Sequence, residues 1–240
     1  MCFSIHIDKD IKRIAKAFSS EIAFGEFEKL KKMQNYMDSL TAQQVKEGLG
    51  LSRIPKSNPF KIPEDDGIVY PNYFAPILIS NNGNRYLTPM RYRLRPKGSR
   101  SEIPSKFNVF NARLDSLLNK KTWKPLVGRN HGLVPFNKFY EWVEENGEKR
   151  LVSFKPSTKK TMWAPCLWDY WESPDRNISF RSFAIITTDP PVEIQEVGHD
   201  RCPIFLDEKY ITNWLSPGQD SEEYLKILEH KEKVIYETIY

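Results

Sequence analysis

A series of short apolar segments separated by turn sequences runs from residue 70 to residue 188. The clearest pair, residues 77–79 and 86–88, flanks Asn81-Asn82-Gly83-Asn84, a sequence typical of a β-hairpin turn. Further strands are predicted at residues 90–96, 132–143, 150–154, 162–168 and 180–188. No internal repeat and no Gly-rich phosphate loop accompany them. The pattern therefore predicts one domain with a mostly antiparallel β core.

Helical patterns flank this β region on both sides. Residues 11–18 and 27–40 have apolar residues at helical spacing, and residues 52–68 are rich in Pro, Ser and Asp, which predicts an exposed connection. Short helices are predicted at residues 114–118 and 210–215, and a charged helical tail at about 219–240. The expected fold class is α+β: a single domain over residues 1–240 whose barrel-like β core is flanked by helices.

The composition of the 240-residue chain limits the classes of protein to which it can belong. Its net charge of +5 permits a nucleic-acid partner without demanding one. No apolar run is long enough to span a bilayer, and the N-terminus has no secretory signal. The three Cys lack the paired spacing of a disulfide framework or a zinc site. We therefore expect a cytoplasmic monomer, associated with the nucleoid if bacterial, that needs no membrane, metal or cofactor.

Cys2 follows the initiator Met1 and has chemistry of its own. An aminopeptidase can remove Met1 before so small a side chain, which leaves an α-amine and a thiol on one residue. The α-amine titrates near ~7.7–8.0 and the thiol near ~8.5, so both nucleophiles are partly available at neutral pH. This 1,2-aminothiol can condense with an aldehyde and close to a thiazolidine. The alternative is that Cys2 only begins a buried strand over residues 2–7.

The extended segment at residues 90–96 is unusually basic. Alternation places Arg91, Arg93 and Arg95 on one face, with Tyr92 and Leu94 on the other. A basic ladder beside an aromatic ring suits the phosphate backbone of a single strand, with a base stacked on the ring. The alternative is a sheet face exposed to water.

Two further residues are candidates for proton transfer. Glu141 lies between Tyr140 and Trp142, and partial desolvation there would raise its pKa and favour a proton donor. The alternative is that strand alternation turns Glu141 towards water. His199 lies on a tight turn before a predicted strand, where it can enter a cleft or serve as a structural residue.

Four short motifs occur in a fixed order along the chain. They are Met1-Cys2, Asn111-Ala112-Arg113, Tyr140-Glu141-Trp142 and the His-x-Arg-x-Pro sequence at residues 199–203. In this order they resemble the SRAP family, the SOS response-associated peptidases. The resemblance runs from Cys2 to about residue 215, with an apparent insertion around residues 20–65. It implies a single-domain sensor of abasic sites in single-stranded DNA.

The resemblance also implies a role for each motif residue. Cys2, once Met1 is removed, would attack the ring-opened aldehyde of an abasic deoxyribose and form a covalent cross-link. Asn111 would orient the N-terminal residue and the sugar, and Arg113 would hold a phosphate near the lesion. Glu141 would shuttle protons during Schiff-base formation and ring closure, while His199 would assist proton transfer and reversal.

The chain departs from the family pattern at several positions. Residues 92–96 read Tyr-Arg-Leu-Arg-Pro where the family has Trp-Gly-Leu-Ile-Pro, so Tyr92 would stack on a base in place of Trp. His131-Gly132 replaces Arg-Cys, and Asp115 replaces a Glu. We also predict DNA contacts from Arg201 and Pro76. These changes keep the proposed chemical groups but bear on DNA contacts and lesion preference.

Two rival functions remain open. Cys2, His199 and Asn111 form the Cys/His/Asn set of a thiol peptidase. The second rival is a non-covalent single-strand binding module that uses Tyr92 and the arginine ladder. A nucleophile at the mature N-terminus favours aldehyde chemistry, because that reaction uses the amine as well as the thiol.

Overall fold

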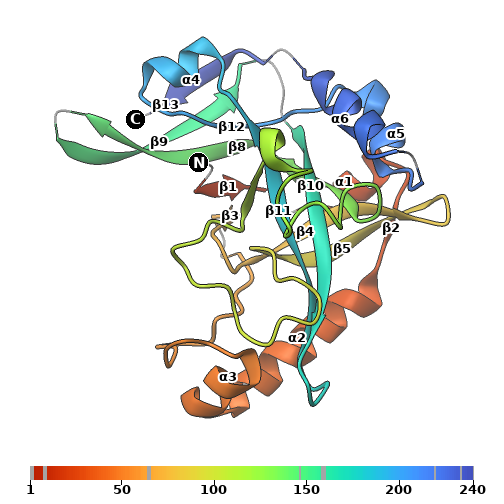
Figure 1. The fold of residues 1–240 in the computed structure, drawn as a ribbon, viewed down its shortest axis with the longest axis vertical. Coiled ribbons are helices and arrows are strands. Elements are labelled where there is room, and N and C mark those ends of the chain that lie inside the picture. The colour runs from red at the N-terminus through yellow and green to blue at the C-terminus, as the bar shows by residue number, and fades with distance from the viewer. Residues whose placement is uncertain are drawn as a thin grey trace.

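The computed structural model describes residues 3–7, 10–63, 66–145, 147–157, 161–218, 220–232 and 234–239, and a closed five-stranded barrel lies at its centre (Figure 1). The barrel strands are β4 (Phe74–Asn81), β5 (Asn84–Tyr92), β7 (His131–Phe136), β10 (Met162–Glu172) and β11 (Ser179–Thr188). Neighbouring strands pair antiparallel in the order β5, β4, β7, β10, β11, and parallel pairing of β11 with β5 closes the ring. The predicted α+β fold with a barrel-like antiparallel core is confirmed.

The β4–β5 hairpin has the turn that its sequence predicts. Asn81 pairs with Asn84, which leaves Asn82 and Gly83 as a two-residue loop. Both loop residues have positive φ, at 50° and 81°, as the tightest hairpin turns require. Asn and Gly tolerate that conformation better than other residues do, so the turn fixes the register of the two strands.

A second sheet packs beside the barrel and holds the N-terminal strand. Its strands, in spatial order, are β13 (Tyr236–Ile239), β9 (Glu148–Pro156), β8 (Lys138–Glu145), β1 (Ser4–His6) and β3 (Ile68–Val69). The β8–β9 hairpin projects to one side of the molecule (Figure 1). Three short strands extend the barrel sheet: β2 (Glu21–Ile22) pairs with β5, while β6 (Asn111–Arg113) and β12 (Cys202–Pro203) pair with β11.

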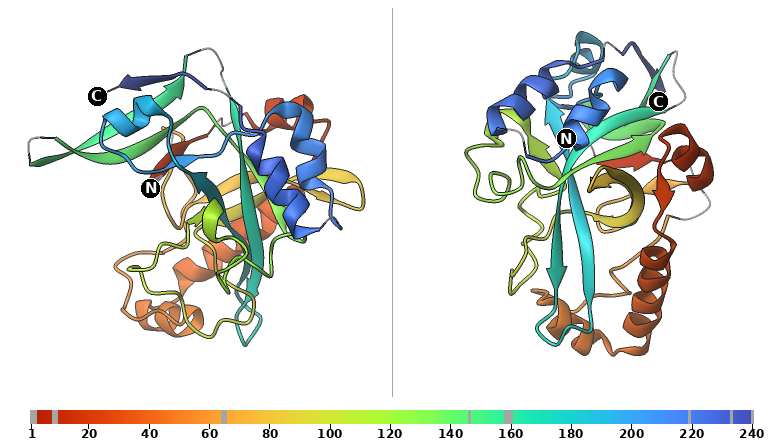
Figure 2. Two further views of the ribbon diagram at one scale, coloured as in Figure 1. Left: turned by 45° about the horizontal axis from the view of Figure 1, so that its top comes forward. Right: turned by 90° about the vertical axis from the view of Figure 1, so that its right-hand side faces the viewer.

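The helices gather at opposite ends of the barrel (Figure 2). One end carries α2 (Phe24–Ser39) and α3 (Ala42–Leu49), which form a separate apolar cluster with Trp171 and Phe180 of the β10–β11 hairpin. The other end carries α4 (Val192–Glu196), α5 (Ile211–Leu215) and α6 (Ser221–Glu229), and α1 (Ile11–Ala17) follows β1. Single-turn 3-10 helices span Leu114–Ser116 and Glu208–Tyr210. No helix in the described parts of the chain is long and apolar enough to cross a bilayer.

The C-terminal segment differs from the helical tail that the sequence predicts. Its first part forms α6, but residues 236–239 form β13 and pair antiparallel with β9. The cause is an aromatic anchor, since the Tyr236 ring lies 5.8 Å from that of Phe139 and 6.1 Å from that of Phe205. Burying Tyr236 in the main core outweighs the helical preference of the charged segment before it.

Candidate functional site

Glu141 points inward from β8, which settles the direction that its sequence left open. Phe139 and Val143, two residues away on either side, are buried in the main core, and Glu141 itself is 1% exposed. Trp142 points outward instead and is 47% exposed. Burial raises the pKa of Glu141, while its contact with His199 opposes part of that increase. The carboxyl group is therefore poised to hold a proton.

His199 meets Glu141 from the turn between α4 and β12. Its Nε2 lies 3.0 Å from Oε2 of Glu141, and its Nδ1 lies 2.9 Å from the carbonyl oxygen of Arg201. If Nδ1–H donates to that carbonyl, the Glu141 carboxyl group donates a proton to Nε2. If Nδ1 instead accepts from the Arg201 amide, 3.3 Å away, Nε2–H donates to the carboxylate. In either tautomer one proton lies between Nε2 and Oε2, so the pair can transfer it.

Asn111 is buried and held on three sides. Asn111 pairs with Ile185 of β11, and its backbone N–H donates to Oδ1 of Asn108 at 3.0 Å. The Tyr92 hydroxyl donates to the side-chain Oδ1 of Asn111 at 3.3 Å. Tyr92 is fully buried and stacks on Phe183 with ring centroids 5.1 Å apart. The prediction that Tyr92 stacks on a base is therefore wrong for this structure: β5 turns the ring into the core, where it orients Asn111.

Strand β11 brings two of the predicted DNA-binding arginines together. Thr187 pairs with Arg113 on one side and with Pro203 of β12 on the other. Asp115 lies 2.6 Å from Nη2 of Arg113 and 3.7 Å from Nη2 of Arg201, and the hydrogen bond from Arg113 keeps the pKa of Asp115 low. The Arg113 side chain is 53% exposed, so it is open to an anion from solvent.

Cys2 lies outside the described residues, but the strand that follows it is described. The Phe3 amide donates to the carbonyl oxygen of Tyr140 at 3.1 Å, and Ser4 pairs with Tyr140. The N-terminal strand therefore runs beside the part of β8 that carries Glu141.

The other two cysteines are poor nucleophiles. Cys166 and Cys202 are both buried, and burial raises the pKa of Cys166 well above that of a free thiol. Burial likewise raises the pKa of Cys202 to about 12, and its Sγ contacts the Tyr236 hydroxyl at 3.6 Å. The thiolate is the reactive form of cysteine, so neither residue competes with Cys2 as a nucleophile at neutral pH.

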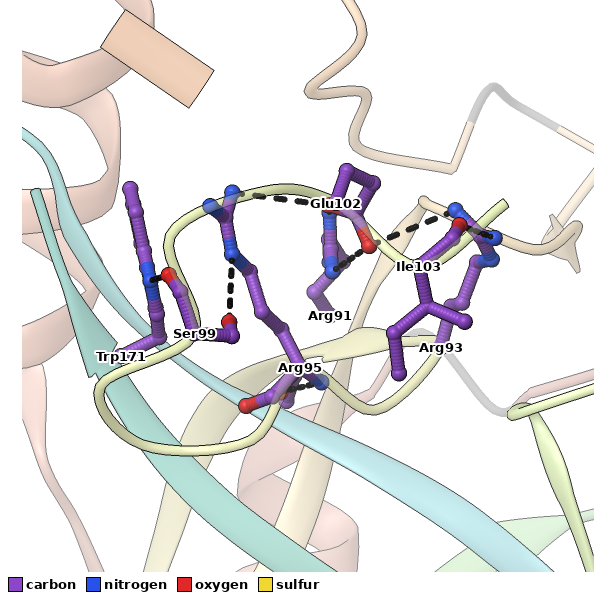
Figure 3. Close-up of polar contacts among 8 residues, drawn as sticks. Arg91, Arg93, Arg95, Ser99, Glu102, Ile103 and Trp171 are labelled. Carbon is purple, nitrogen blue, oxygen red and sulfur yellow. Dashed lines mark hydrogen bonds and ion pairs between the residues drawn. The ribbon is translucent and has the colours of Figure 1, made fainter. Parts of the chain in front are cut away.

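Arg91, Arg93 and Arg95 do not form the exposed ladder that the sequence predicts. Their side chains are 3%, 10% and 0% exposed and contact Glu102 (Figure 3). The reason is that β5 ends at Tyr92, and the chain then turns back. The part of the loop that carries Ser99, Glu102 and Ile103 lies over the three arginines.

A further outcome concerns the DNA contact predicted for Pro76. Pro76 is buried in β4 opposite Pro89, so in this structure its ring is not an open contact surface. The contact between Glu102 and the arginines was not predicted. The sequence does mark Glu102, because it is the only acidic residue among residues 91–106. Among the described residues, no group of three or more His, Cys, Asp or Glu side chains is arranged to hold a metal ion.

Comparison with known proteins gives consistent matches over most of the chain. A family model described as SOS response associated peptidase (SRAP) matches residues 1–239. The abasic site processing protein YoqW of Bacillus subtilis strain 168 is 29% identical over 171 residues, which cover 68% of this chain and 75% of that protein. The abasic site processing protein HMCES of Pongo abelii is 25% identical over 208 residues, covering 70% and 58%. A crystal structure of a Bacteroides thetaiotaomicron protein shares the fold, with a TM-score of 0.68 at 17% identity over 99% of this chain and 90% of that chain.

Proposed function

Because the chain belongs to the SOS response-associated peptidase family, we propose that it processes abasic sites in single-stranded DNA. Relatives from Bacillus subtilis and Pongo abelii are named for abasic site processing. We further propose that Cys2, after removal of Met1, forms a covalent thiazolidine with the aldehyde of the ring-opened deoxyribose. The observation that supports this mechanism best is the Glu141–His199 pair. The two side chains are buried, share a proton and lie on or beside β8, next to the N-terminal strand.

The reaction proceeds in two additions. The α-amine of Cys2 attacks the aldehyde carbon and gives a carbinolamine. Glu141 donates a proton to the hydroxyl group, which leaves as water and produces an iminium ion. The Cys2 sulfur then adds to the same carbon, and the thiol proton is lost to a base, so that the net change is loss of one water. His199 accepts and returns the proton of Glu141 through the 3.0 Å contact.

The remaining site residues position the strand. Asn111 presents a side-chain amide whose orientation Tyr92 fixes, and it holds the N-terminal residue and the sugar. Arg113 binds a phosphate by exchanging its contact with Asp115 for the DNA backbone, a step that its exposure makes inexpensive. Arg201 is buried against Asp115 and Asp189, and it supports that phosphate site from behind.

The two rival functions have weaker support. A thiol peptidase needs a histidine that activates the thiol, whereas Nε2 of His199 faces a carboxyl group and its Nδ1 faces backbone of Arg201. A non-covalent binding module would need an exposed Tyr92, which is buried. Aldehyde chemistry at an N-terminal aminothiol uses the buried acid directly.

Intact-mass measurement separates the three functions. The protein is mixed with an abasic oligonucleotide, the same oligonucleotide without the lesion, and a peptide. The proposed function predicts a heat-stable, DNA-sized mass increase with the abasic strand alone. Peptide cleavage without an adduct would favour the peptidase, and binding of both strands without an adduct would favour the module.

A further inference from the structure

Residues 91–106 carry a charge excess that the rest of the protein does not share. They contain six Lys or Arg residues and one Glu, a formal charge of +5, which equals the net charge of the entire chain. The other 224 residues are therefore neutral overall. Such a concentrated positive segment is the electrostatic footprint of an anion-binding region.

Three of these cations converge on the single carboxylate (Figure 3). Arg91 makes two hydrogen bonds to Glu102, at 2.7 and 3.2 Å. Arg93 reaches the same carboxylate at 3.4 Å, and Arg95 at 3.6 Å. The Glu102 side chain is only 7% exposed, so solvent does little to reduce the repulsion among the guanidinium groups.

One carboxylate cannot satisfy three guanidinium groups, and Arg95 is the group left over. Its side chain is fully buried, yet neither terminal nitrogen has a hydrogen-bond partner. Its guanidinium group stacks on Trp171, 3.4 Å from the ring centroid, which leaves the edge that carries these nitrogens directed at Glu102. Burial lowers the pKa of Arg95 to about 10, although Glu102 opposes that shift. A buried donor without an acceptor is costly, so the cluster is built for more acceptor oxygens than a carboxylate has.

The backbone at Arg93 supports the same reading. Its φ is 140°, in the region that favours glycine. Arg93 occupies this position although glycine would adopt the bend with less strain. Its side chain bonds both Glu102 and the carbonyl oxygen of Ile103. The strain is therefore offset by contacts of the charged group.

We propose that Arg91, Arg93 and Arg95 form a phosphate-binding site that Glu102 occupies until a phosphate or phosphodiester group takes its place. The four tetrahedral oxygens of inorganic phosphate match three guanidinium forks better than two carboxylate oxygens do, and a phosphodiester adds two bridging oxygens to its two charged ones. Glu102 lies on the covering segment, residues 97–106, which is part of the connection between β5 and β6. This connection contains no helix or strand. Among the contacts that hold it are the Glu102 amide on the Gly50 carbonyl at 3.0 Å and Trp171 Nε1 on the Ser99 carbonyl at 2.8 Å. Lys97 and Arg100 are exposed on its outer side and attract the anion.

The site rests on the proposed function only in naming DNA as one source of phosphate. The test therefore uses labelled oligothymidylate without an abasic site, so Cys2 chemistry makes no contribution. Arg95→Gln is expected to weaken binding and to flatten the dependence of log affinity on log salt by about 0.7, the value of one lost contact with a single strand. Glu102→Gln is expected to tighten binding about tenfold, because the internal competitor is removed.

Matched controls come from the exposed Arg176–Glu172 pair, whose side chains are 82% and 39% exposed. Arg176→Gln and Glu172→Gln make the same charge changes outside the cluster, and they should leave the salt slope unchanged. If Arg95→Gln gives the slope of Arg176→Gln and Glu102→Gln gives the affinity of Glu172→Gln, the arginines only fasten the segment to the barrel, and the proposal is overturned.

A measurement on the wild-type protein decides the matter even if the cluster variants fail to fold. Because Glu102 and the three arginines are almost completely buried, an anion can reach them only when the segment that carries Glu102 moves away from the barrel. That movement breaks the hydrogen bond from the Glu102 amide to Gly50, so exchange of this amide hydrogen should accelerate when the anion is added. Acceleration by inorganic phosphate alone identifies a free phosphate site, and acceleration by oligothymidylate alone identifies a site for the DNA backbone. Unchanged exchange with both anions would refute the proposal, and a failure of abasic cross-linking would not alter this result.

Discussion

His131 should make the stability of this protein depend on pH in a window that can be stated in advance. The His131 ring stacks on the Trp214 ring with centroids 4.0 Å apart, and it makes an edge-to-face contact with the Tyr224 ring at a centroid distance of 4.1 Å. Its Nδ1–H donates to the Trp214 carbonyl oxygen at 2.9 Å, and its Nε2 accepts from the Gly128 amide at 2.8 Å. Protonation of Nε2 would destroy the second bond and bury a charge, so burial lowers the pKa of His131 to about 4.

The sign and size of the effect follow from that pKa. The folded state binds the proton less well than the unfolded chain, whose His titrates near 6.5. The contribution to stability is therefore complete above pH 6.5 and is lost as the pH falls from 6.5 through about 4. At about 1.4 kcal/mol per pH unit, the loss amounts to about 3 kcal/mol, a large part of the ~5–15 kcal/mol that holds a typical domain folded.

Urea unfolding between pH 4 and 7 measures this loss. Carboxyl groups also titrate there, so the informative quantity is the difference between wild type and His131→Gln, whose amide offers both an N–H donor group and an acceptor oxygen at every pH. Wild type should lose about 3 kcal/mol more than this variant over the window. His230→Gln is the control, since His230 is exposed and its ring stacks on Tyr210, and it should keep the wild-type curve. Parallel curves for wild type and His131→Gln would refute the reasoning.

Two other predictions follow from single contacts. Glu141→Gln should slow adduct formation with an abasic strand by about 10²–10⁴-fold in a time course, and His199→Ala should slow exchange onto a competing strand still more. Wild-type rates in both variants would mean that the buried pair is only structural. Gly132→Ala should reduce the free energy of unfolding by ~1–3 kcal/mol, because its Cβ would lie 2.9 Å from Ile77 Cγ2 and 3.0 Å from Cys166 Sγ. Gly25→Ala in α2, with no atom within 4 Å of the new Cβ, should be neutral or stabilising, and an equal loss in both would contradict the steric argument.

The sequence predicts the strands of the barrel better than it predicts which loops lie over the surfaces of those strands. Strand periods and the Asn82-Gly83 turn are local signals, so the barrel and the β4–β5 hairpin could be predicted. Alternation also grouped Arg91 with Arg93 and Arg95. It gave no information on whether another segment would lie over them, because that contact involves Glu102, which is separated from the strand by a loop.

The candidate site shows the same division. The residue types of Glu141 and His199 indicated proton transfer, but their 3.0 Å contact joins β8 to a turn 58 residues later and depends on how the second sheet packs against the barrel. For Tyr92, the residue type led to a wrong prediction. An aromatic ring beside a basic strand is typical of base stacking, but the same ring is also the side chain that best fills a core, and here it packs on Phe183 and bonds Asn111.

The most direct test of the covalent mechanism is intact-mass analysis of wild type, Cys2→Ala and Cys2→Ser after mixing with an abasic single strand, with and without borohydride. The mechanism predicts a heat-stable DNA adduct in wild type without reductant and none in Cys2→Ala. Cys2→Ser keeps the amine but has a poor ring-closing nucleophile, so it should give an adduct only when borohydride traps the Schiff base. A wild-type yield of stable adduct from Cys2→Ala would remove Cys2 from the reaction and contradict the mechanism.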